Sequence, residues 1–315
     1  MSGNCLPRPI MILGAPRSGT SLIQQIVRGC DGCAAVASEA QSIWAQYTHP
    51  AQHGWVGEKW AAESVDDCQR LAIRREFARN ALPAHVWHRF DKASVMERQR
   101  RLGVPSWALR FAYRVWLGAR KAVRSPAWRL RLAEKSVHAG LWPGLVEYVF
   151  PDVCFVHVVR DPEATIDSIG RGWRAPGRFD TYSLPQDSLS TAGQPRTWKF
   201  PLPTGWQHYL SSPLSDIAAF QWVSIQESIL AHARCSEAPY LRLRLEDLIA
   251  SPRRELERLA EFVELPWQPQ LERYGSAVPR VNADVETDRV SRLTVNDGHL
   301  SQRLKALADE FGYSY

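Results

Sequence analysis

The chain has 315 residues and a formal net charge of +6; 45 % of its residues are hydrophobic and 23 % are charged. This balance is typical of a globular protein with a sizeable core, and six cysteines in this length exclude a disulfide-rich scaffold. Since the sequence has no apolar run of membrane-spanning length, no signal-peptide pattern and no N-x-[ST] acceptor, we expect a cytoplasmic protein whose basic charge favours an anionic ligand.

Predicted strands and helices alternate along the chain. Residues 9–14 form a short apolar run that ends in glycine, which predicts a buried strand, and residues 20–27 carry apolar side chains at helical spacing. A second strand is predicted over 153–159, and a third, over 240–245, precedes a helix over 252–263. Strand followed by helix, repeated, predicts an α/β fold with a parallel sheet flanked by helices on both faces.

We interpret residues 1–315 as a single domain with two insertions. Residues 58–131 are mostly helical in pattern and rich in Trp and Arg. Residues 174–215 hold many Pro, Gly and Ser residues and predict a long, lid-like loop.

The turn after the first strand has the glycine spacing of a phosphate-binding P-loop. It reads "GAPRSGTS" from Gly14 to Ser21, but Thr20 occupies the position of the P-loop lysine. The backbone N–H groups of residues 17–21 and the following helix N-terminus suit a single phosphate, and Arg17 supplies a fixed cation. We therefore expect an anion site without the lysine that grips a β/γ-phosphate.

The turn after the second strand carries the second candidate anion site. Asp161 can cap a helix and Pro162 fits its first position, so the strand–helix junction lies directly beside Arg160. Because parallel strands end at the same edge of a sheet, the two turns are expected to be close together.

Four landmarks occur along the chain, one of them "EKSVHAGLWPGLVEYVFPDVCFVHVVRDP", which runs from an E-K-[TS] segment to the arginine of the second turn. Together they resemble the sulfotransferases that use 3′-phosphoadenosine 5′-phosphosulfate (PAPS), in the branch with the tyrosylprotein sulfotransferases and bacterial relatives. "GAPRSGTSL" resembles their 5′-phosphosulfate loop. "VVRDPEATIDSI" resembles their 3′-phosphate motif, in which a serine follows the arginine by eight residues, as Ser168 follows Arg160. "LRLRLEDLIASPRRELERLAEFVELPW" resembles a later segment, and the landmarks together extend over about residues 10–270.

The resemblance implies in-line transfer of the sulfuryl group from PAPS, as a co-substrate and without a metal, to a hydroxyl acceptor. It implies that Arg17 and Lys135 stabilise the transferred group and that Glu39 takes the acceptor proton. The residues implied to bind PAPS are Arg17, Ser18, Gly19, Thr20, Ser21, Arg160, Ser168 and Arg292.

Three histidines are rivals of Glu39 as the base. His138 is the better rival because it follows Lys135 closely, and His53 is a further one. His157 lies within an apolar strand and is interpreted as a core histidine.

The sequence departs from the family pattern at two positions. Leu245 stands where the family often has a tyrosine that contacts the nucleotide, and Arg292 replaces a usual lysine. Arg171 is a further candidate beside Arg160 for the 3′-phosphate.

The nature of the acceptor stays open among a peptide tyrosine, a glycan and a small molecule. Ten Lys or Arg residues and no Asp or Glu occur from Arg98 to Arg131, with aromatic residues between them. This stretch favours an acidic acceptor, an anionic membrane surface or simply a solvated helix face. Nucleic acid is not expected as a partner, and a homodimer stays open.

Two other functions are alternatives. A P-loop kinase or NTPase would need the missing lysine, and a non-catalytic nucleotide-binding module would keep the phosphate turn alone. The lone C-x-x-C pair, Cys30 and Cys33, is interpreted as reduced thiols and not as a zinc site.

Overall fold

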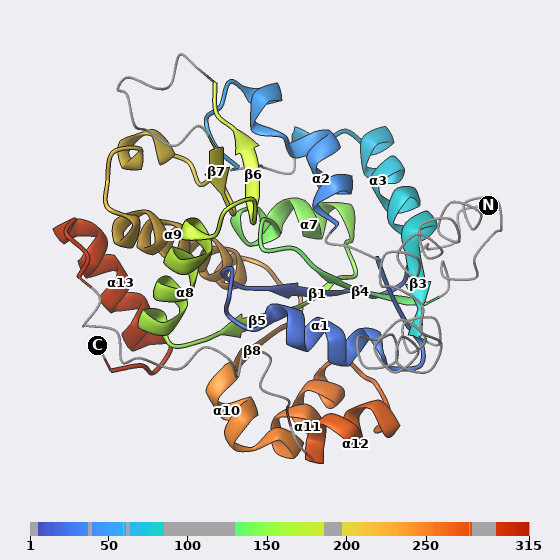
Figure 1. Cartoon of the computed structure of the whole chain (residues 1–315). Coiled ribbons are helices and arrows are strands. Elements are labelled where there is room, and N and C mark those ends of the chain that lie inside the picture. The colour runs from blue at the N-terminus through green and yellow to red at the C-terminus, as the bar shows by residue number, and fades with distance from the viewer. Residues whose placement is uncertain are drawn as a thin grey trace, which may run out of the picture.

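The computed structural model describes residues 6–36, 40–58, 60, 64–84, 130–185, 197–276, 278 and 294–314 (Figure 1). Within these ranges a six-stranded sheet runs through the molecule in the order β3-β2-β4-β1-β5-β8. All neighbouring strands are parallel except β3, which pairs antiparallel with β2 at one edge. The strands of this sheet are β1 (Ile10–Leu13), β2 (Cys33–Val36), β3 (Ala81–Pro83), β4 (Arg131–Lys135), β5 (Cys154–Val159) and β8 (Tyr240–Arg244).

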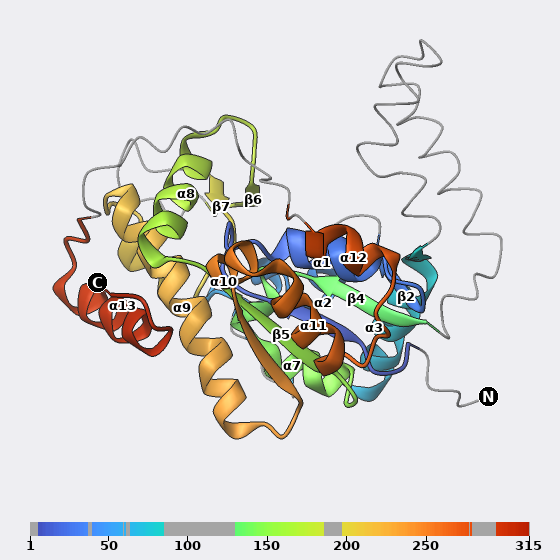
Figure 2. The same ribbon diagram turned by 90° about the horizontal axis from the view of Figure 1, so that it is seen from below.

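Helices cover both faces of the sheet, which confirms the predicted α/β fold. Figure 2, seen from below, shows α1 and α10–α12 in front of the strands, while α2, α3, α7 and α9 lie behind them. The helices on the first face are α1 (Thr20–Arg28), α10 (Leu245–Ala250), α11 (Pro252–Phe262) and α12 (Pro269–Ser276). The remaining helices are α2 (Gln41–Thr48), η1 (Pro50–His53), α3 (Asp67–Asn80), η4 (Ala139–Leu141), α7 (Pro143–Val149), α8 (Pro162–Arg174), η6 (Trp206–Tyr209), α9 (Leu214–Cys235) and α13 (Gly298–Glu310).

The alternation of side chains along β1 explains why the sheet is covered on both sides. Ile10 and Ile12 belong to the core with α1, α10, α11 and α12, whereas Met11 and Leu13 belong to the core with α2, α3, α7 and α9. Because successive strand residues point to opposite faces, a strand that is apolar at every position must be buried on both.

The predicted elements correspond to β1, α1, β5, α8, β8 and α11. The strand β2 and the 22-residue helix α9 are not among the predicted elements. β2 reads "CAAV", four residues with little β-branching, and its pairing with β4 is what makes it a strand.

The described residues of the two predicted insertions contain both helices and strands; α3 fits the helical pattern of the first insertion, whereas the second departs from the predicted loop. Residues 58–131 contain α3 and β3, while residues 85–129, and with them nearly all of the basic stretch from Arg98, lie outside the described residues. Residues 174–215, predicted as a loop, include a two-stranded antiparallel sheet of β6 (Asp180–Ser183) and β7 (Thr197–Lys199) and the short helix η6.

In the part of the chain that the structure describes, no helix combines the length and the apolar character that crossing a bilayer requires.

Candidate active site

The turn between β1 and α1 is shaped by two glycines and a strained arginine. Gly14 has φ of +151°, and a Cβ there would lie 2.5 Å from the carbonyl oxygen of Val158 on the neighbouring β5. Arg17 and Gly19 also have positive φ, of +71° and +98°. The Ser18 hydroxyl donates to the carbonyl of Ala15 at 2.7 Å, so this side chain stabilises the turn itself.

The helix that follows supplies an N-terminus at the turn. α1 begins at Thr20, which is buried, while Ser21 is exposed. The first N–H groups of a helix have no partner within it, and they point out of the helix end towards the turn. The turn therefore has the backbone of an anion site.

The second turn, between β5 and α8, meets the first directly. The Asp161 side chain accepts from the N–H of Ala164 at 2.8 Å, which caps α8 as predicted. Arg160 donates through Nη1 to the carbonyl of Arg17 at 3.2 Å, and Arg17 donates through Nε to the Ser168 hydroxyl at 3.0 Å. The two turns are adjacent because β1 and β5 are paired neighbours that end at the same edge.

A cluster of four arginines, Arg17, Arg160, Arg171 and Arg178, surrounds this junction. Burial lowers the pKa of Arg17, and the positive charges of the other three lower it further. Burial and the neighbouring Arg160 also lower the pKa of Arg171. Arg171 forms an ion pair with Asp167 on the same helix. Arg17 and Arg160 are partly buried and Arg171 and Arg178 are exposed. The repulsion among these like charges would be offset by a bound anion, so the arginine cluster suits a phosphate.

The β6–β7 insertion covers the arginine cluster. The guanidinium carbon of Arg17 lies 5.7 Å from the ring centroid of Phe179, which stacks on Phe200 at 4.8 Å. Phe200 in turn packs against Gly172 of α8, where a Cβ would lie only 2.5 Å from its ring. The segment predicted as a lid-like loop thus supplies a ring that contacts the phosphate turn.

The third landmark of the sequence also lies at this edge. Leu245 packs on Gly19, where a Cβ would lie 2.9 Å from its side chain. Glu246 accepts from the N–H of Asp161 at 3.0 Å and from the Tyr313 hydroxyl at 2.7 Å. The "LEDL" segment therefore joins both anion turns to the C-terminal part of the chain.

Lys135 lies on the other side of β1. It ends β4 in register with Ile12, is 4 % exposed and follows the buried Glu134. Glu134 accepts from the N–H of Ala40 at 3.3 Å, which ties the start of α2 to this strand.

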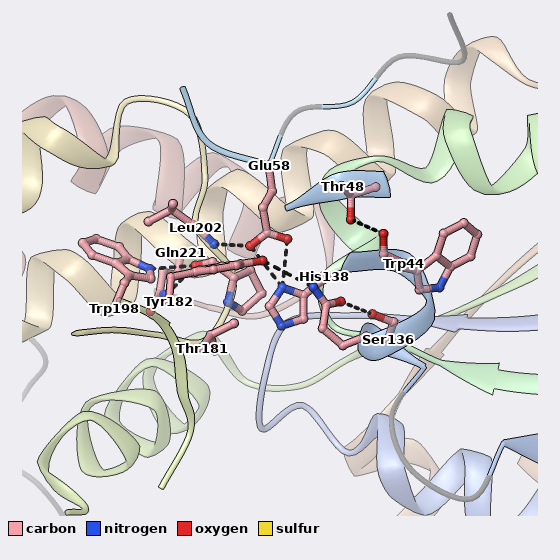
Figure 3. Close-up of polar contacts among 12 residues, drawn as sticks. Trp44, Thr48, Glu58, Ser136, His138, Thr181, Tyr182, Trp198, Leu202 and Gln221 are labelled. Carbon is pink, nitrogen blue, oxygen red and sulfur yellow. Dashed lines mark hydrogen bonds and ion pairs between the residues drawn. The ribbon is translucent and has the colours of Figure 1, made fainter. Parts of the chain in front are cut away.

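Three residues after Lys135, His138 forms a buried pair with Glu58 (Figure 3). The His138 Nδ1 lies 2.8 Å from Oε2 and 3.0 Å from Oε1 of Glu58. The three elements that meet here are the end of β4, the segment after η1 and the β6–β7 insertion.

Comparison with known proteins decides the family. The profile of the sulfotransferase family matches residues 9–269. The chain belongs to the sulfotransferase family. Among curated proteins none matches the chain.

Solved sulfotransferase structures resemble the chain over nearly its whole length at low identity. The sulfotransferase domain of the Synechococcus PCC 7002 olefin synthase is 19 % identical, with a TM-score of 0.49 and coverage of 100 % of this chain and 98 % of that one. The sulfotransferase domain of the curacin biosynthetic pathway is 17 % identical, with a TM-score of 0.49 and coverage of 98 % and 99 %. Sulfotransferase STF9 of Mycobacterium avium is 16 % identical, with a TM-score of 0.45 and coverage of 97 % and 76 %.

In the present structure most of the predicted site residues lie close together. The turn 17–21, Arg160 and Ser168 meet at one junction, with Lys135 at the end of the adjacent strand. Glu39 and Arg292 lie outside the described residues, so their roles stay predictions.

Two of the rival histidines have structural partners. His157 is fully buried, and its ring nitrogens lie 2.5 Å from the Tyr240 hydroxyl and 2.6 Å from the Gln226 side-chain oxygen, which confirms it as a core histidine. His53, the last residue of η1, has its Nε2 atom 3.3 Å from the carbonyl oxygen of Tyr47 in α2.

Glu58 is the site residue that sequence reasoning missed. It lies 80 positions before His138 along the chain. It is the first residue of the insertion over 58–131, for which the sequence predicted only mostly helical structure. No local motif marks such a pair, because it exists only once two distant loops are folded together.

The described residues contain no group of three or more His, Cys, Asp or Glu side chains that could hold a metal ion. Burial raises the pKa of both Cys30 and Cys33 to about 12, so both are protonated thiols in this structure.

Proposed function

We propose that this sulfotransferase uses PAPS as its donor and transfers the sulfuryl group to a hydroxyl acceptor. The single observation that carries the proposal is the contact between the two anion turns, in which Arg160 reaches the backbone of Arg17 and Arg17 reaches Ser168. PAPS has a phosphate at each end of one ribose, so it needs two anion sites a short distance apart.

In this proposal each turn binds one phosphate. The backbone N–H groups of residues 17–21 and the hydroxyls of Thr20 and Ser21 hold the 5′-phosphosulfate at the N-terminus of α1, and Arg160 and Ser168 hold the 3′-phosphate. Arg171 supports Arg160, and Arg292 closes over the nucleotide. The residues fit the group, because burial and then the repulsion of neighbouring arginines lower the pKa of Arg17, and a bound anion would offset both.

The chemistry follows from the cations at the strand ends. As the acceptor oxygen attacks sulfur in line, charge builds on the leaving oxygen of adenosine 3′,5′-bisphosphate (PAP). Arg17 and Lys135 stabilise that charge from either side of β1. The acceptor proton goes to a base, for which the sequence favours Glu39 and names His138 as the rival.

Membership of the sulfotransferase family supports a hydroxyl group as the acceptor and does not distinguish among molecules that carry one. A peptide tyrosine, a glycan and a small molecule all fit, and the basic stretch from Arg98 to Arg131 favours an acidic one. The cytoplasmic location and a homodimer stay predictions from the sequence.

A ligand–variant cycle tests the two-site binding of the nucleotide. PAP and AMP differ only in the 3′-phosphate, so calorimetry with both measures what that phosphate contributes. We expect wild-type protein to bind PAP about 10- to 100-fold more tightly than AMP, the range for a hydrogen-bonded charge pair, and Arg160→Ala to remove most of this difference. Arg253→Ala, which alters an exposed arginine paired with Glu257 on α11, is the matched control and should leave it unchanged.

Three outcomes would contradict the proposal. Equal affinity of the wild type for PAP and AMP would remove the 3′-phosphate site. Magnesium-dependent ATP hydrolysis without PAP binding would favour a kinase or NTPase, and PAP binding without PAPS turnover on any acceptor would favour a non-catalytic nucleotide-binding module.

A further inference from the structure

The buried pair of His138 and Glu58 has the geometry of an oriented acid–base group. Both oxygens of Glu58 lie within 3.0 Å of His138 Nδ1, and the side chains are 5 % and 0 % exposed (Figure 3). A buried carboxylate needs such partners, because an isolated buried charge is costly.

Glu58 is held in place from three sides. Its N–H donates to the carbonyl of Leu202 at 2.7 Å, and its side chain accepts from the N–H of Leu202, also at 2.7 Å. The Tyr182 hydroxyl hydrogen-bonds the same carboxylate; burial and the charge of Glu58 raise the pKa of Tyr182, so this hydroxyl keeps its proton and donates. Gly57 permits the close approach, since a Cβ there would lie 2.7 Å from the backbone of Thr204.

The carboxylate decides which nitrogen of His138 carries the proton. An ionised carboxylate only accepts hydrogen bonds, so Nδ1 must be the donor. A neutral imidazole has one N–H, and with that proton on Nδ1 the lone pair is on Nε2.

We propose that Glu58 is a positioning residue that holds His138 in the Nδ1–H tautomer, and that His138 Nε2 is the base that takes the acceptor proton. This inference rests on the proposed sulfuryl transfer. The acceptor hydroxyl gives its proton to Nε2 while its oxygen forms a bond to sulfur, and the bond from sulfur to the phosphate oxygen of PAP breaks with its electron pair going to PAP. The imidazolium so formed is stabilised by the Glu58 carboxylate, the role that a carboxylate partner gives to a histidine base.

The position of His138 relative to the donor site supports this role. Lys135 is in register with Ile12, two residues before the phosphate turn begins at Gly14, and His138 follows Lys135 by three residues at the same edge of the sheet. Ser136, next to Lys135, lies 3.5 Å from Gln41, whose amide donates to the Tyr182 hydroxyl at 3.3 Å. The same polar network therefore links the base, its partner and the strand that carries the cation.

The tautomer can be measured without activity. Long-range proton–nitrogen spectra of ¹⁵N-histidine-labelled protein distinguish the two imidazole nitrogens, and His138→Gln identifies the signals of His138. We expect the Nδ1–H tautomer in the wild type and loss of that preference in Glu58→Gln, which keeps the shape of the side chain but not its charge.

A second histidine–glutamate pair, partly exposed, provides the control. Nε2 of His232 in α9 lies 2.7 Å from the carboxylate of Glu147 in α7. Neither residue belongs to the two anion turns. Glu147→Gln should alter the signals of His232 and leave those of His138 unchanged. A wild-type His138 with the proton on Nε2, or a tautomer unchanged by Glu58→Gln, would overturn the role of Glu58.

Turnover then decides between the two bases. With PAPS as donor and phenol, which is protonated at neutral pH, as acceptor, we expect His138→Gln to lower PAP release at least about 100-fold at unchanged PAP affinity and more than Glu39→Gln does. Arg253→Ala is the control and should stay within about twofold of the wild type. The opposite order would overturn the assignment of the base to His138. The failure of the donor site itself is seen separately, because a wild type without saturable PAP binding contradicts the proposed function whatever the tautomer of His138.

Discussion

At the scale of single residues, the same side-chain type serves different purposes according to its surroundings. His157 and His138 are both buried, yet His157 is enclosed by the neutral partners Gln226 and Tyr240, whereas His138 faces the carboxylate of Glu58. Burial without a charged partner disfavours the imidazolium, and burial lowers the pKa of His157 to about 3.

The low pKa of His157 predicts a pH dependence of stability. Its folded-state pKa lies below the ordinary value of 6.5, so between pH 6.5 and about 3 the unfolded chain binds a proton that the folded chain does not. The free energy of unfolding should therefore fall with falling pH in this window, with a contribution from His157 of about 1.4 kcal/mol per pH unit.

Denaturant unfolding at several pH values measures this contribution. His157→Gln should flatten the slope, and His208→Gln, a substitution of an exposed histidine, should not. Equal slopes in the wild type and His157→Gln would show that the folded chain binds as many protons at His157 as the unfolded chain does, which would contradict the lowered pKa.

At the scale of elements, α8 connects the second anion turn to the insertion that covers the first. Its N-terminus is capped by Asp161 beside Arg160, and near its C-terminus Gly172 accommodates the ring of Phe200. The Phe200–Phe179 stack then reaches Arg17. A substitution at Gly172 should therefore displace the Phe200 and Phe179 rings and change the surroundings of Arg17 in the phosphate turn.

Two glycines of α8 form a matched pair for this prediction. A Cβ at Gly170 would have no atom closer than 3.9 Å, whereas one at Gly172 would lie 2.5 Å from the Phe200 ring. Replacing a helical glycine by alanine favours the helix by about 1 kcal/mol, so Gly170→Ala should raise the free energy of unfolding. Gly172→Ala should lower it by about 1–3 kcal/mol through overpacking and should weaken PAP binding.

Urea denaturation and PAP calorimetry of the two variants provide the measurement. If Gly172→Ala were as stable as Gly170→Ala and bound PAP like the wild type, the Phe179–Phe200 stack would have no part in shaping the site.

At the scale of the whole molecule, the site is closed by contacts between distant parts of the chain. Glu246 receives hydrogen bonds from Asp161 at the start of α8 and from Tyr313 next to α13. Through Glu246 the C-terminal segment is thereby connected by hydrogen bonds to the start of α8, next to the junction of the two turns.

Removal of one hydroxyl tests this support. Tyr313→Phe should lower the free energy of unfolding by about 1–2 kcal/mol, raise amide hydrogen exchange in α13 and weaken PAP binding a few-fold, because a hydrogen bond to a carboxylate is lost. Tyr148→Phe removes a hydroxyl bonded to Asp67 on the surface and should stay within about 0.5 kcal/mol of the wild type. Unchanged exchange in α13 would show that Glu246 does not hold the C-terminal segment.

The sequence by itself determined the parallel α/β fold, the two strand–helix turns and the family, because each depends on local order: an apolar run, a glycine spacing, a capping residue. It placed Arg17, Arg160 and Ser168 at strand ends, and the rule that parallel strands end at one edge was enough to expect them together. Only the tertiary structure decided what covers and completes the site. The Glu58–His138 pair, the ring of Phe179 over Arg17 and the bond from Tyr313 to Glu246 join residues far apart in the chain, and such contacts leave no periodicity or spacing that a sequence pattern can reveal.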